Sequence, residues 1–448
     1  MSRFLFATQP ITGHLLPAIP IVSEMVRRGH EVVWYAGQKF RTKVEATGAR
    51  FAPYVQAKDY DDDDYNAAFP GRANLKGLNQ IKFDFIHLFI RQIAPQHRDL
   101  QAILAGFKAD VIIGDPSVFA TFTVNDTGGP PNVVYNITVL GIKGRDVAPF
   151  GLGILPNASS IGRVRNRLLQ FMATNVVFKT VSAEMLKATA EVGGKPRKFE
   201  GVLCPRYLLL EPTVPAFEYP RSDLPPQVHF IGALLPDTPK AFTPPAWWDE
   251  VIRKTKPVVL VTQGTVATDQ EQLIAPTLKA LANEDVLVIA AGVKDKSALG
   301  AIPANAHVEA FVPFALLMPH IDVYITNGGY GGVSIALANG VPLITGGITE
   351  DKPEVGNRVA YSGVGINLKT ATPTPVQVKE AVQKILHDSR YRERARQIQA
   401  DFARYDAPNE AARLLEQLAK TQQPVFRRDA VTQQEPGKVG NQTVKLVR

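Results

Sequence analysis

Short apolar runs alternate with helical repeats of apolar residues along most of the chain. Residues 4–8 form the first apolar run, residues 9–14 are a turn region with Pro and Gly, and apolar positions then recur at helical spacing as far as Val26. A second run at 31–36 completes a strand–helix–strand unit, which predicts parallel strands joined by a right-handed crossover. Further buried strands are predicted at 111–113 and 133–137, so the first half is expected to be α/β.

The second half repeats this rhythm more regularly and predicts a second doubly wound sheet. Its strands are expected at 258–262, 286–290, 308–311, 323–326, 343–345 and 365–368. Helical patterns at 375–387, 391–404 and 409–420 are expected to close the fold.

Proline-rich and polar segments mark the predicted domain boundaries. The stretch 235–256 is rich in proline and has few periodic apolar positions, and the chain beyond Gln422 is rich in glutamine. We therefore predict an N-terminal α/β domain at 1–235, a linker at 236–256, a C-terminal α/β domain at 257–420 and a disordered tail at 421–448.

Residues 56–96 are less regular and contain an acidic run at 61–64 and a dense apolar set that includes Phe83, Ile86 and Phe89. The apolar set is too dense for a surface helix, and it predicts either a core helix or the wall of an apolar substrate pocket. The acidic run is expected to be a solvated loop rather than a metal site. Metal-binding carboxylates normally stand at strand ends with a spacing set by coordination.

Composition narrows the class of protein without changing this picture. The chain has 448 residues, of which 45% are apolar and 21% are charged, as is usual for globular proteins. The one cysteine, Cys204, rules out a disulfide framework and a multi-cysteine zinc site. No apolar stretch reaches the ~18 residues of a membrane span and no secretory leader is evident. We therefore expect a cytoplasmic protein without integral membrane association.

The net charge of +8 invites a nucleic-acid-binding interpretation. Residues 421–448 carry five cations and two anions, so +3 of this charge belongs to the predicted tail. No Lys/Arg cluster interleaved with aromatic residues appears elsewhere, and we expect no nucleic-acid partner.

Two candidate catalytic residues follow predicted strands. His14 comes just before a helix with Pro17 near its start, and the helix N-terminus is expected to favour the neutral, proton-accepting imidazole. Asp115 follows the strand at 111–113 and should stand at the same carboxyl edge of the sheet, where such a carboxylate can orient an imidazole as a dyad. Each residue also has a purely structural alternative. His14 could be a packing residue, and Asp115 could be a helix N-cap before Pro116.

A glycine-rich turn follows the strand at 323–326 and precedes a helix predicted at 333–338. The turn would leave free backbone N–H groups for a phosphate and consists of Asn327, Gly328, Gly329, Tyr330, Gly331 and Gly332. Gly264 and Thr265 follow the first strand of the second half and add a small turn and a hydroxyl donor. Neither a dinucleotide Gly-x-Gly-x-x-Gly after the first strand nor a Walker-type Gly-Lys-Ser/Thr is present.

Together these motifs resemble the nucleotide-sugar-dependent glycosyltransferases of the GT-B fold, in the bacterial UDP-glycosyltransferase branch that decorates macrolides, polyketides and flavonoids. The resemblance extends to about residue 420 and is most specific over 307–365. It implies two Rossmann-like domains facing each other across a cleft, with the acceptor bound by the first and the nucleotide sugar by the second. It also implies inverting transfer of a hexose from a UDP- or dTDP-linked co-substrate to a hydroxyl of an apolar small molecule, with no cofactor and no metal.

The resemblance assigns roles to individual residues. In the first domain, His14 would be the general base of catalysis and Asp115 its partner. In the second domain, Phe311 would stack on the pyrimidine base and Val312 would bond to that base through its backbone. Thr265 and the turn after Asn327 would bind the diphosphate, and Asp351 would bind the sugar.

The chain departs from the family pattern on the donor side. Asn327 replaces His, Gly332 replaces Thr or Ser, Ile335 replaces Glu, Lys352 replaces Gln and Phe314 replaces Gln. Lys352 could bond the sugar or the diphosphate, whereas Ile335 cannot replace a carboxylate that grips ribose. These changes bear on the identity of the donor more than on the type of reaction. They also suggest the alternative of a catalytically silent nucleotide-sugar-binding or auxiliary relative. A sugar-nucleotide epimerase of the same fold is a second alternative.

Overall fold

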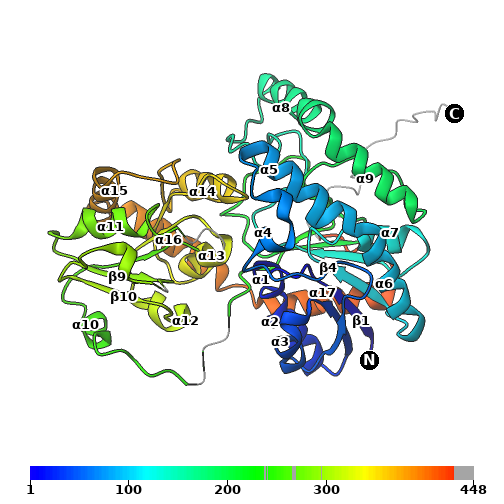
Figure 1. Cartoon of the computed structure of the whole chain (residues 1–448), viewed down its shortest axis with the longest axis horizontal. Coiled ribbons are helices and arrows are strands. Elements are labelled where there is room, and N and C mark those ends of the chain that lie inside the picture. The colour runs from blue at the N-terminus through cyan, green and yellow to red at the C-terminus, as the bar shows by residue number, and fades with distance from the viewer. Residues whose placement is uncertain (237–238, 240, 265–268, 294, 428–448) are drawn as a thin grey trace, which may run out of the picture.

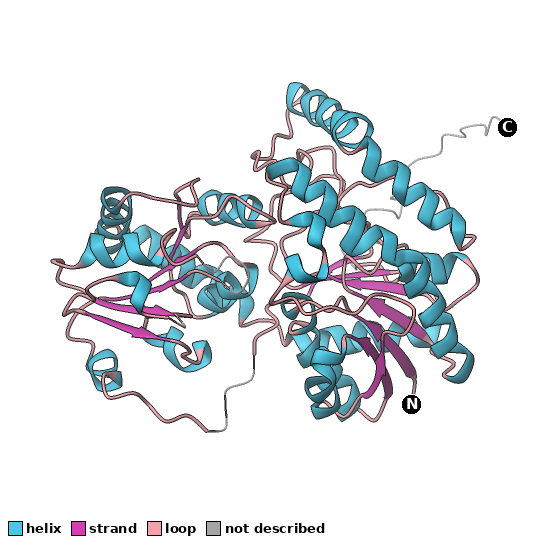
Figure 2. Ribbon diagram, in the orientation of Figure 1, coloured by secondary structure: helices cyan, strands magenta, loops and turns pink. Residues whose placement is uncertain are grey.

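The computed structural model describes residues 1–427 apart from 237–238, 240, 265–268 and 294, and these residues form two α/β domains side by side (Figure 1). Each domain has a central sheet of parallel strands with helices around it (Figure 2). Separate apolar clusters lie against each sheet, so most strand residues are buried. This explains why the strands are continuous apolar runs rather than alternating patterns.

The N-terminal sheet has the strand order β3-β2-β1-β4-β5-β6-β7. Its strands are β1 (Arg3–Ala7), β2 (Glu31–Ala36), β3 (Arg50–Pro53), β4 (Val111–Gly114), β5 (Asn132–Tyr135), β6 (Leu208–Glu211) and β7 (Val228–Phe230). The helices of this part of the chain are α1 (Thr12–Leu15), α2 (Ala18–Arg27), α3 (Arg41–Ala46), α4 (Tyr65–Ala68), α5 (Gly77–Asp84), α6 (Ile93–Gly106), α7 (Ala120–Asp126), α8 (Ser160–Met172) and α9 (Lys179–Glu191).

The C-terminal sheet has the order β10-β9-β8-β11-β12-β13. Its strands are β8 (Val258–Thr262), β9 (Leu287–Ala291), β10 (Ala306–Glu309), β11 (Val323–Thr326), β12 (Leu343–Thr345) and β13 (Gly365–Asn367). The later helices are α10 (Trp248–Arg253), α11 (Ile274–Leu281), α12 (Phe314–Leu317), α13 (Tyr330–Ala338), α14 (Lys352–Tyr361), α15 (Pro375–His387), α16 (Ser389–Phe402) and α17 (Ala407–Thr421). Among the described residues, no helix is long and apolar enough to cross a bilayer.

The two doubly wound sheets confirm the predicted fold class, and four predicted strands, β2, β8, β11 and β12, have the predicted bounds. Two boundaries differ in ways that affect the candidate site. β10 ends at Glu309, so Phe311 lies beyond the strand rather than at its end, and α13 begins at Tyr330 rather than Val333. Gly331 and Gly332 therefore belong to the first turn of the helix.

The predicted domain boundaries need correction. The segment predicted as a linker contains α10, and Trp247 and Val251 are buried in the C-terminal core. The last helix, α17, packs beside α2 in the N-terminal domain, and its apolar face, including Leu414 and Leu418, is buried in the core under β1 and β4 (Figure 1). The chain thus crosses back to its first domain after α16.

The start of the predicted tail also packs on the N-terminal domain. Val425 is buried in the same core, and its backbone N–H donates to the Tyr207 carbonyl at 3.0 Å. His229 Nε2 lies 3.0 Å from the Val425 carbonyl oxygen. The expectation of disorder is therefore wrong for 422–427, and the rest of the predicted tail lies outside the described residues.

A truncation series tests this packing. A chain ending at Gln422 is expected to lose about 1–3 kcal/mol of unfolding free energy relative to a chain ending at Arg427, because burial of Val425 is lost. Urea denaturation of the two truncated proteins measures the difference. Equal stability would show that Val425 contributes nothing to the N-terminal core.

Candidate functional site

His14 and Asp115 meet at the carboxyl edge of the N-terminal sheet. β1 and β4 are neighbours there, with Ala7 paired to Gly114, and the strand order changes direction between them. His14 Nδ1 lies 3.1 Å from Asp115 Oδ1, an ion-pair contact without the alignment of a hydrogen bond. The Asp115 side chain is fully buried, and that of His14 is 15% exposed. The structure therefore brings the two predicted side chains together at the position where open α/β sheets bind ligands.

Backbone N–H groups hold the Asp115 carboxylate in place. The Gln9 N–H donates to Oδ2 at 2.7 Å, and the Ser117 N–H donates to Oδ1 at 2.7 Å. The following helix, α7, begins at Ala120 and has Phe119 at its N-cap, so the alternative of a helix N-cap for Asp115 is wrong. Asp115 is instead fixed by two loops and keeps Oδ1 facing the imidazole.

His14 lies within α1 rather than in a loop before a helix, which corrects the sequence prediction. α2 begins only at Ala18, so His14 does not stand at its N-terminus. The Tyr135 hydroxyl donates to the His14 carbonyl oxygen at 2.8 Å. This bond ties the short helix to the end of β5 and fixes the backbone that carries the imidazole.

The acidic run helps to hold α1. Asp62 accepts a hydrogen bond from the Thr12 N–H at 2.7 Å, and its side chain is only 6% exposed. Lys39 Nζ lies 2.6 Å from Asp61, 2.8 Å from Asp62 and 3.1 Å from Asp63. Although burial opposes ionisation, the bonds from Lys39 and Thr12 lower the pKa of Asp62. The expectation of a solvated loop holds for Asp61 and Asp63, whereas Asp62 is a positioning residue that sequence reasoning missed.

The predicted apolar wall lies beside His14 at one point. The Phe89 ring centroid is 6.3 Å from that of His14, at an interplanar angle of 23°. Phe89 ends the π-helical segment Phe85–Phe89, while Phe83 lies in α5 with its ring stacked on His87 at 4.0 Å. Phe83 and Ile86 pack against different apolar clusters, and Phe89 contacts both. Phe89 is thus the member of the predicted wall that lies next to the imidazole.

The corresponding edge of the C-terminal sheet carries the predicted phosphate-binding turn. β8 and β11 are neighbours at the point where this sheet's strand order changes direction. Gly264 has a φ of +113°, and a Cβ there would lie 2.6 Å from the Asn327 amide nitrogen. Glycine is therefore required by both the backbone conformation and the close approach. Thr265 lies outside the described residues.

The glycine-rich turn leads directly into α13. Asn327 Oδ1 accepts from the Gly329 N–H at 3.2 Å, which orders the turn, and Gly329 is the N-cap of the helix. A Cβ on Gly331 would meet nothing within 4 Å, so the first turn of the helix is open on this side. Free N–H groups at such a helix start favour an anion.

Gly332 is explained by packing. A Cβ at this position would lie 2.7 Å from the Tyr324 hydroxyl, which is itself 2.7 Å from Thr262 Oγ1. Tyr324 thus occupies the space that a Ser or Thr side chain at position 332 would need, a compensation that the sequence alone did not reveal.

The two predicted base-binding residues have opposite environments. The Phe311 side chain is 78% exposed beyond the end of β10, whereas Val312 is buried in the C-terminal core. Because Val312 is buried, it holds this part of the chain in place, and the exposed ring of Phe311 beside it provides a face on which a planar base can stack. Ile335, by contrast, is partly buried against the same core.

Asp351 and Lys352 connect the turn to the other domain. Thr138, which follows β5, donates from its hydroxyl to the Asp351 carboxylate, and burial raises the pKa of Asp351. Lys352 is buried with its ammonium paired to Glu350, and its side chain lies 3.6 Å from where a Cβ on Gly328 would be. The loops that follow β5 and β12 at the carboxyl edges of the two sheets are therefore in direct contact.

A buried ion cluster fixes α14 against the N-terminal domain nearby. Arg358 Nε donates to Glu218 Oε2 at 2.8 Å, and Arg358 Nη1 to Glu354 Oε2 at 3.2 Å, with all three side chains at most 6% exposed. Glu354 Oε1 also accepts from the Gly151 and Gly153 N–H groups at 3.0 Å and 2.9 Å. The domain interface around Arg358 is thus lined by buried, paired charges.

Two Rossmann-like sheets, joined through the loops beyond their carboxyl edges, define a two-domain α/β protein of the GT-B class. Solved structures share this fold. The chain superposes with a TM-score of 0.72 on the calicheamicin glycosyltransferase CalG4, at 22% identity over 94% of this chain and 99% of that one. The glycosyltransferase of kitacinnamycin gives a TM-score of 0.71 at 20% identity, with the same coverage of 94% and 99%.

Sequence relatives identify the family. Residues 275–418 match the family described as erythromycin biosynthesis protein CIII-like, C-terminal domain. The chain is 42% identical to 4'-demethylrebeccamycin synthase of Lentzea aerocolonigenes over 93% of this chain and 99% of that relative. It is 36% identical to UDP-glycosyltransferase 2 of Phaeomoniella chlamydospora over 93% and 95% of the two chains. The chain belongs to the UDP-glycosyltransferase family and is a glycosyltransferase.

Proposed function

We propose that this enzyme transfers a hexose from a UDP- or dTDP-linked donor to a hydroxyl group of an apolar natural product, with inversion at the anomeric carbon. The observation that carries the proposal is the contact of His14 with Asp115 at the switch point of the N-terminal sheet, together with the open start of α13 at the switch point of the C-terminal sheet. Relatives named 4'-demethylrebeccamycin synthase and oleandomycin glycosyltransferase support a natural-product acceptor. A cytoplasmic location is part of the proposal, because a single cysteine permits no internal disulfide.

In the proposed reaction, His14 Nε2 removes the proton of the acceptor hydroxyl as its oxygen attacks the anomeric carbon. The bond from that carbon to the phosphate oxygen breaks, and the nucleoside diphosphate leaves with the electron pair. Asp115 stabilises the imidazolium through Nδ1, at the 3.1 Å contact. The proton on His14 is lost to solvent after the glycoside departs.

The departing diphosphate would be received by the start of α13. The N–H groups of Gly331 and Gly332 and the Asn327 amide are the donors proposed for this anion. Asp351, held by Thr138, would accept bonds from the sugar hydroxyls, and Phe311 would stack on the pyrimidine. The acceptor would lie against Phe89, with Phe83 and Ile86 behind it.

Acceptor-dependent release of nucleoside diphosphate tests the proposal. The enzyme is incubated with UDP-glucose or dTDP-glucose and a panel of apolar phenols and alcohols, and diphosphate release is measured with and without acceptor. Release that requires a hydroxyl acceptor is expected. Donor binding without turnover for any acceptor would favour the silent alternative, and conversion of the free donor to another sugar nucleotide would favour an epimerase.

Turnover is expected to persist in excess EDTA. Backbone N–H groups at the helix start are proposed to take the leaving charge, a role that a divalent ion would otherwise fill. The carboxylates Asp61, Asp62 and Asp63 lie close enough together to hold a cation, but the Lys39 ammonium already pairs with all three. Complete loss of activity with EDTA, restored by magnesium or manganese, would contradict the proposal and promote this cluster to a candidate site.

Weak discrimination between UDP and dTDP donors is expected, with a preference for dTDP. A carboxylate bonded to ribose is worth about 1.5–3 kcal/mol, and Ile335 supplies none. The alternative is that Ile335 only packs against the C-terminal core and that another group binds the ribose. Steady-state kinetics with UDP-glucose and dTDP-glucose measure the ratio. A preference for UDP of about a hundredfold or more, kept in Ile335→Ala, would show that ribose is recognised elsewhere.

A further inference from the structure

α8 carries an apolar stripe that no described element covers. Ile161, Val164, Leu168 and Phe171 are 84%, 70%, 60% and 59% exposed. At about 100° per residue these positions share one narrow face of the helix. Figure 1 shows α8 at the rim of the N-terminal domain, remote from α13 and the C-terminal sheet. Large apolar side chains clustered on one exposed face indicate an interaction surface.

The segment that carries this stripe has cationic side chains and no acidic ones. No Asp or Glu occurs from residue 147 to residue 183, whereas Arg163, Arg165, Arg167 and Lys179 fall in this interval. Arg163 is turned inward and pairs with Asp146 at 2.8 Å. By the helical spacing, Arg165 and Arg167 lie on opposite sides of the apolar stripe. The helix thus carries apolar residues between two cations, of which Arg167 is exposed and Arg165 is half-buried and donates to the Leu155 carbonyl at 3.2 Å.

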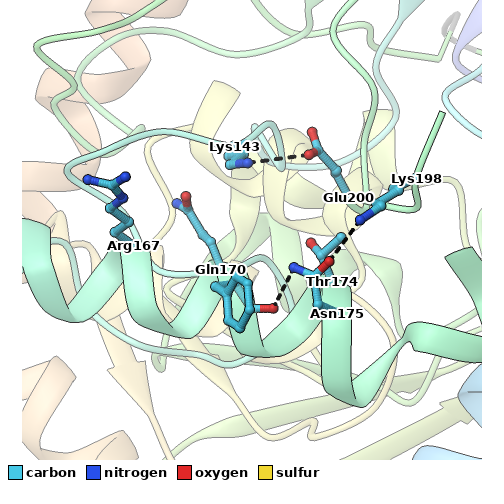
Figure 3. A pocket seen from close by; sticks show the side chains of 8 residues that line it. Lys143, Arg167, Gln170, Thr174, Asn175, Lys198 and Glu200 are labelled. Carbon is cyan, nitrogen blue, oxygen red and sulfur yellow. Dashed lines mark hydrogen bonds and ion pairs between the residues drawn. The ribbon is translucent and has the colours of Figure 1, made fainter. Parts of the chain in front are cut away.

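A cationic pocket opens next to the stripe. It encloses about 390 Å³ and is lined by Phe171 of the stripe, by Arg167 and by residues after β5 and α9. Figure 3 shows Lys143 beside Glu200, at 3.3 Å, and Lys198 donating to Asn175 at 2.9 Å. Within the described residues, Arg167 has neither an ion pair nor a hydrogen bond. Three cations against one carboxylate make this pocket suited to a phosphate group.

We propose that α8 docks on an anionic lipid surface. The stripe would lie at the boundary between headgroups and acyl chains, with Arg165, Arg167 and the cationic pocket bound to lipid phosphates. The exposed face of α8 is apolar in the centre and has a cation on either side, which fits an anionic lipid interface. This inference is independent of the proposed reaction, because none of these residues belongs to the site around His14.

Vesicle flotation of the full chain tests the proposal. The protein is expected to bind phosphatidylcholine vesicles that contain phosphatidylglycerol at low salt, and to bind pure phosphatidylcholine much more weakly. The double variant Arg165→Glu/Arg167→Glu should lower the partition coefficient on anionic vesicles about tenfold or more. Leu168→Gln/Phe171→Gln should lower it similarly, because the apolar contribution is lost.

The matched control is Lys279→Glu/Val376→Gln, which changes one exposed cation and one exposed apolar residue on α11 and α15. Its partition coefficient should equal that of the parent protein, and circular dichroism should show that all variants are folded. Equal binding to both kinds of vesicle, or binding that survives both α8 variants, would overturn the proposal. A dimer that the α8 variants dissociate would also overturn it, because the face would then be covered by a second copy of the chain. Vesicle binding that appears only after residues 428–448 are removed would overturn it as well, because those residues would then be the occupant of this face.

Discussion

Replacing His14 with alanine is expected to lower turnover by about two to four orders of magnitude while leaving nucleotide affinity nearly unchanged. His14 is the proposed base, and its contact with Asp115 at 3.1 Å lies at the edge of the N-terminal sheet. The glycine turn, which is proposed to bind the donor, belongs to the other domain and is not altered. Initial rates with saturating donor, together with calorimetric titration of the nucleoside diphosphate, measure the two effects separately.

His387→Ala is a suitable control, because His387 is an exposed histidine on α15 and contacts no residue of the proposed site. It should keep full activity. Asp115→Asn should lower turnover as well, since the amide cannot stabilise the imidazolium as a carboxylate does. If His14→Ala retained most of the activity with a hydroxyl acceptor, another group would have to be the base.

Replacing Arg358 with methionine is expected to cost about 3–5 kcal/mol of unfolding free energy, the largest stability effect of any single substitution proposed for this protein. Arg358 is 1% exposed and lies between Glu218 of the N-terminal domain and Glu354 of α14. Its guanidinium also lies 4.0 Å from the Tyr219 ring centroid. Removing it would leave two buried carboxylates without their cation. Urea denaturation monitored by circular dichroism measures the loss.

Arg413→Met is the matched control for this change. Arg413 pairs with Glu410 at 2.6 Å on the surface of α17, with its side chain 51% exposed, and such a pair contributes about 1 kcal/mol or less. A loss in Arg358→Met no larger than that of the control would show that the interdomain cluster does not stabilise the fold.

Much of the fold could be predicted from local patterns. The strands β8, β11 and β12 are buried on both faces, so their apolar runs begin and end where the strands do. His14 and Asp115 could be placed together because parallel neighbouring strands bring their carboxyl ends to one edge. The same rule brought Gly264 and Asn327 together in the C-terminal sheet.

The remaining features of the fold and of the site depend on contacts between residues far apart in the sequence, which no local pattern encodes. The spacing of Leu414 and Leu418 predicts an amphipathic helix, but it does not say that α17 returns to the first domain. Val425 is an isolated apolar residue without periodic neighbours, and its burial follows from the position at which α17 ends. Arg358 and Glu218 are 140 residues apart, and Asp62 reaches the Thr12 N–H across 50 residues. Only the assembled fold brings these groups together.

The anomeric configuration of the product tests most directly whether this enzyme inverts. UDP-glucose or dTDP-glucose, α-linked and labelled with carbon-13 at the anomeric position, is incubated with the enzyme and the best apolar hydroxyl acceptor, and the product is examined by NMR. A single displacement by an acceptor oxygen that His14 deprotonates predicts a β-linked glycoside and one nucleoside diphosphate released for each glycoside formed. An α-linked glycoside, or consumption of the donor with no label on the acceptor, would contradict it.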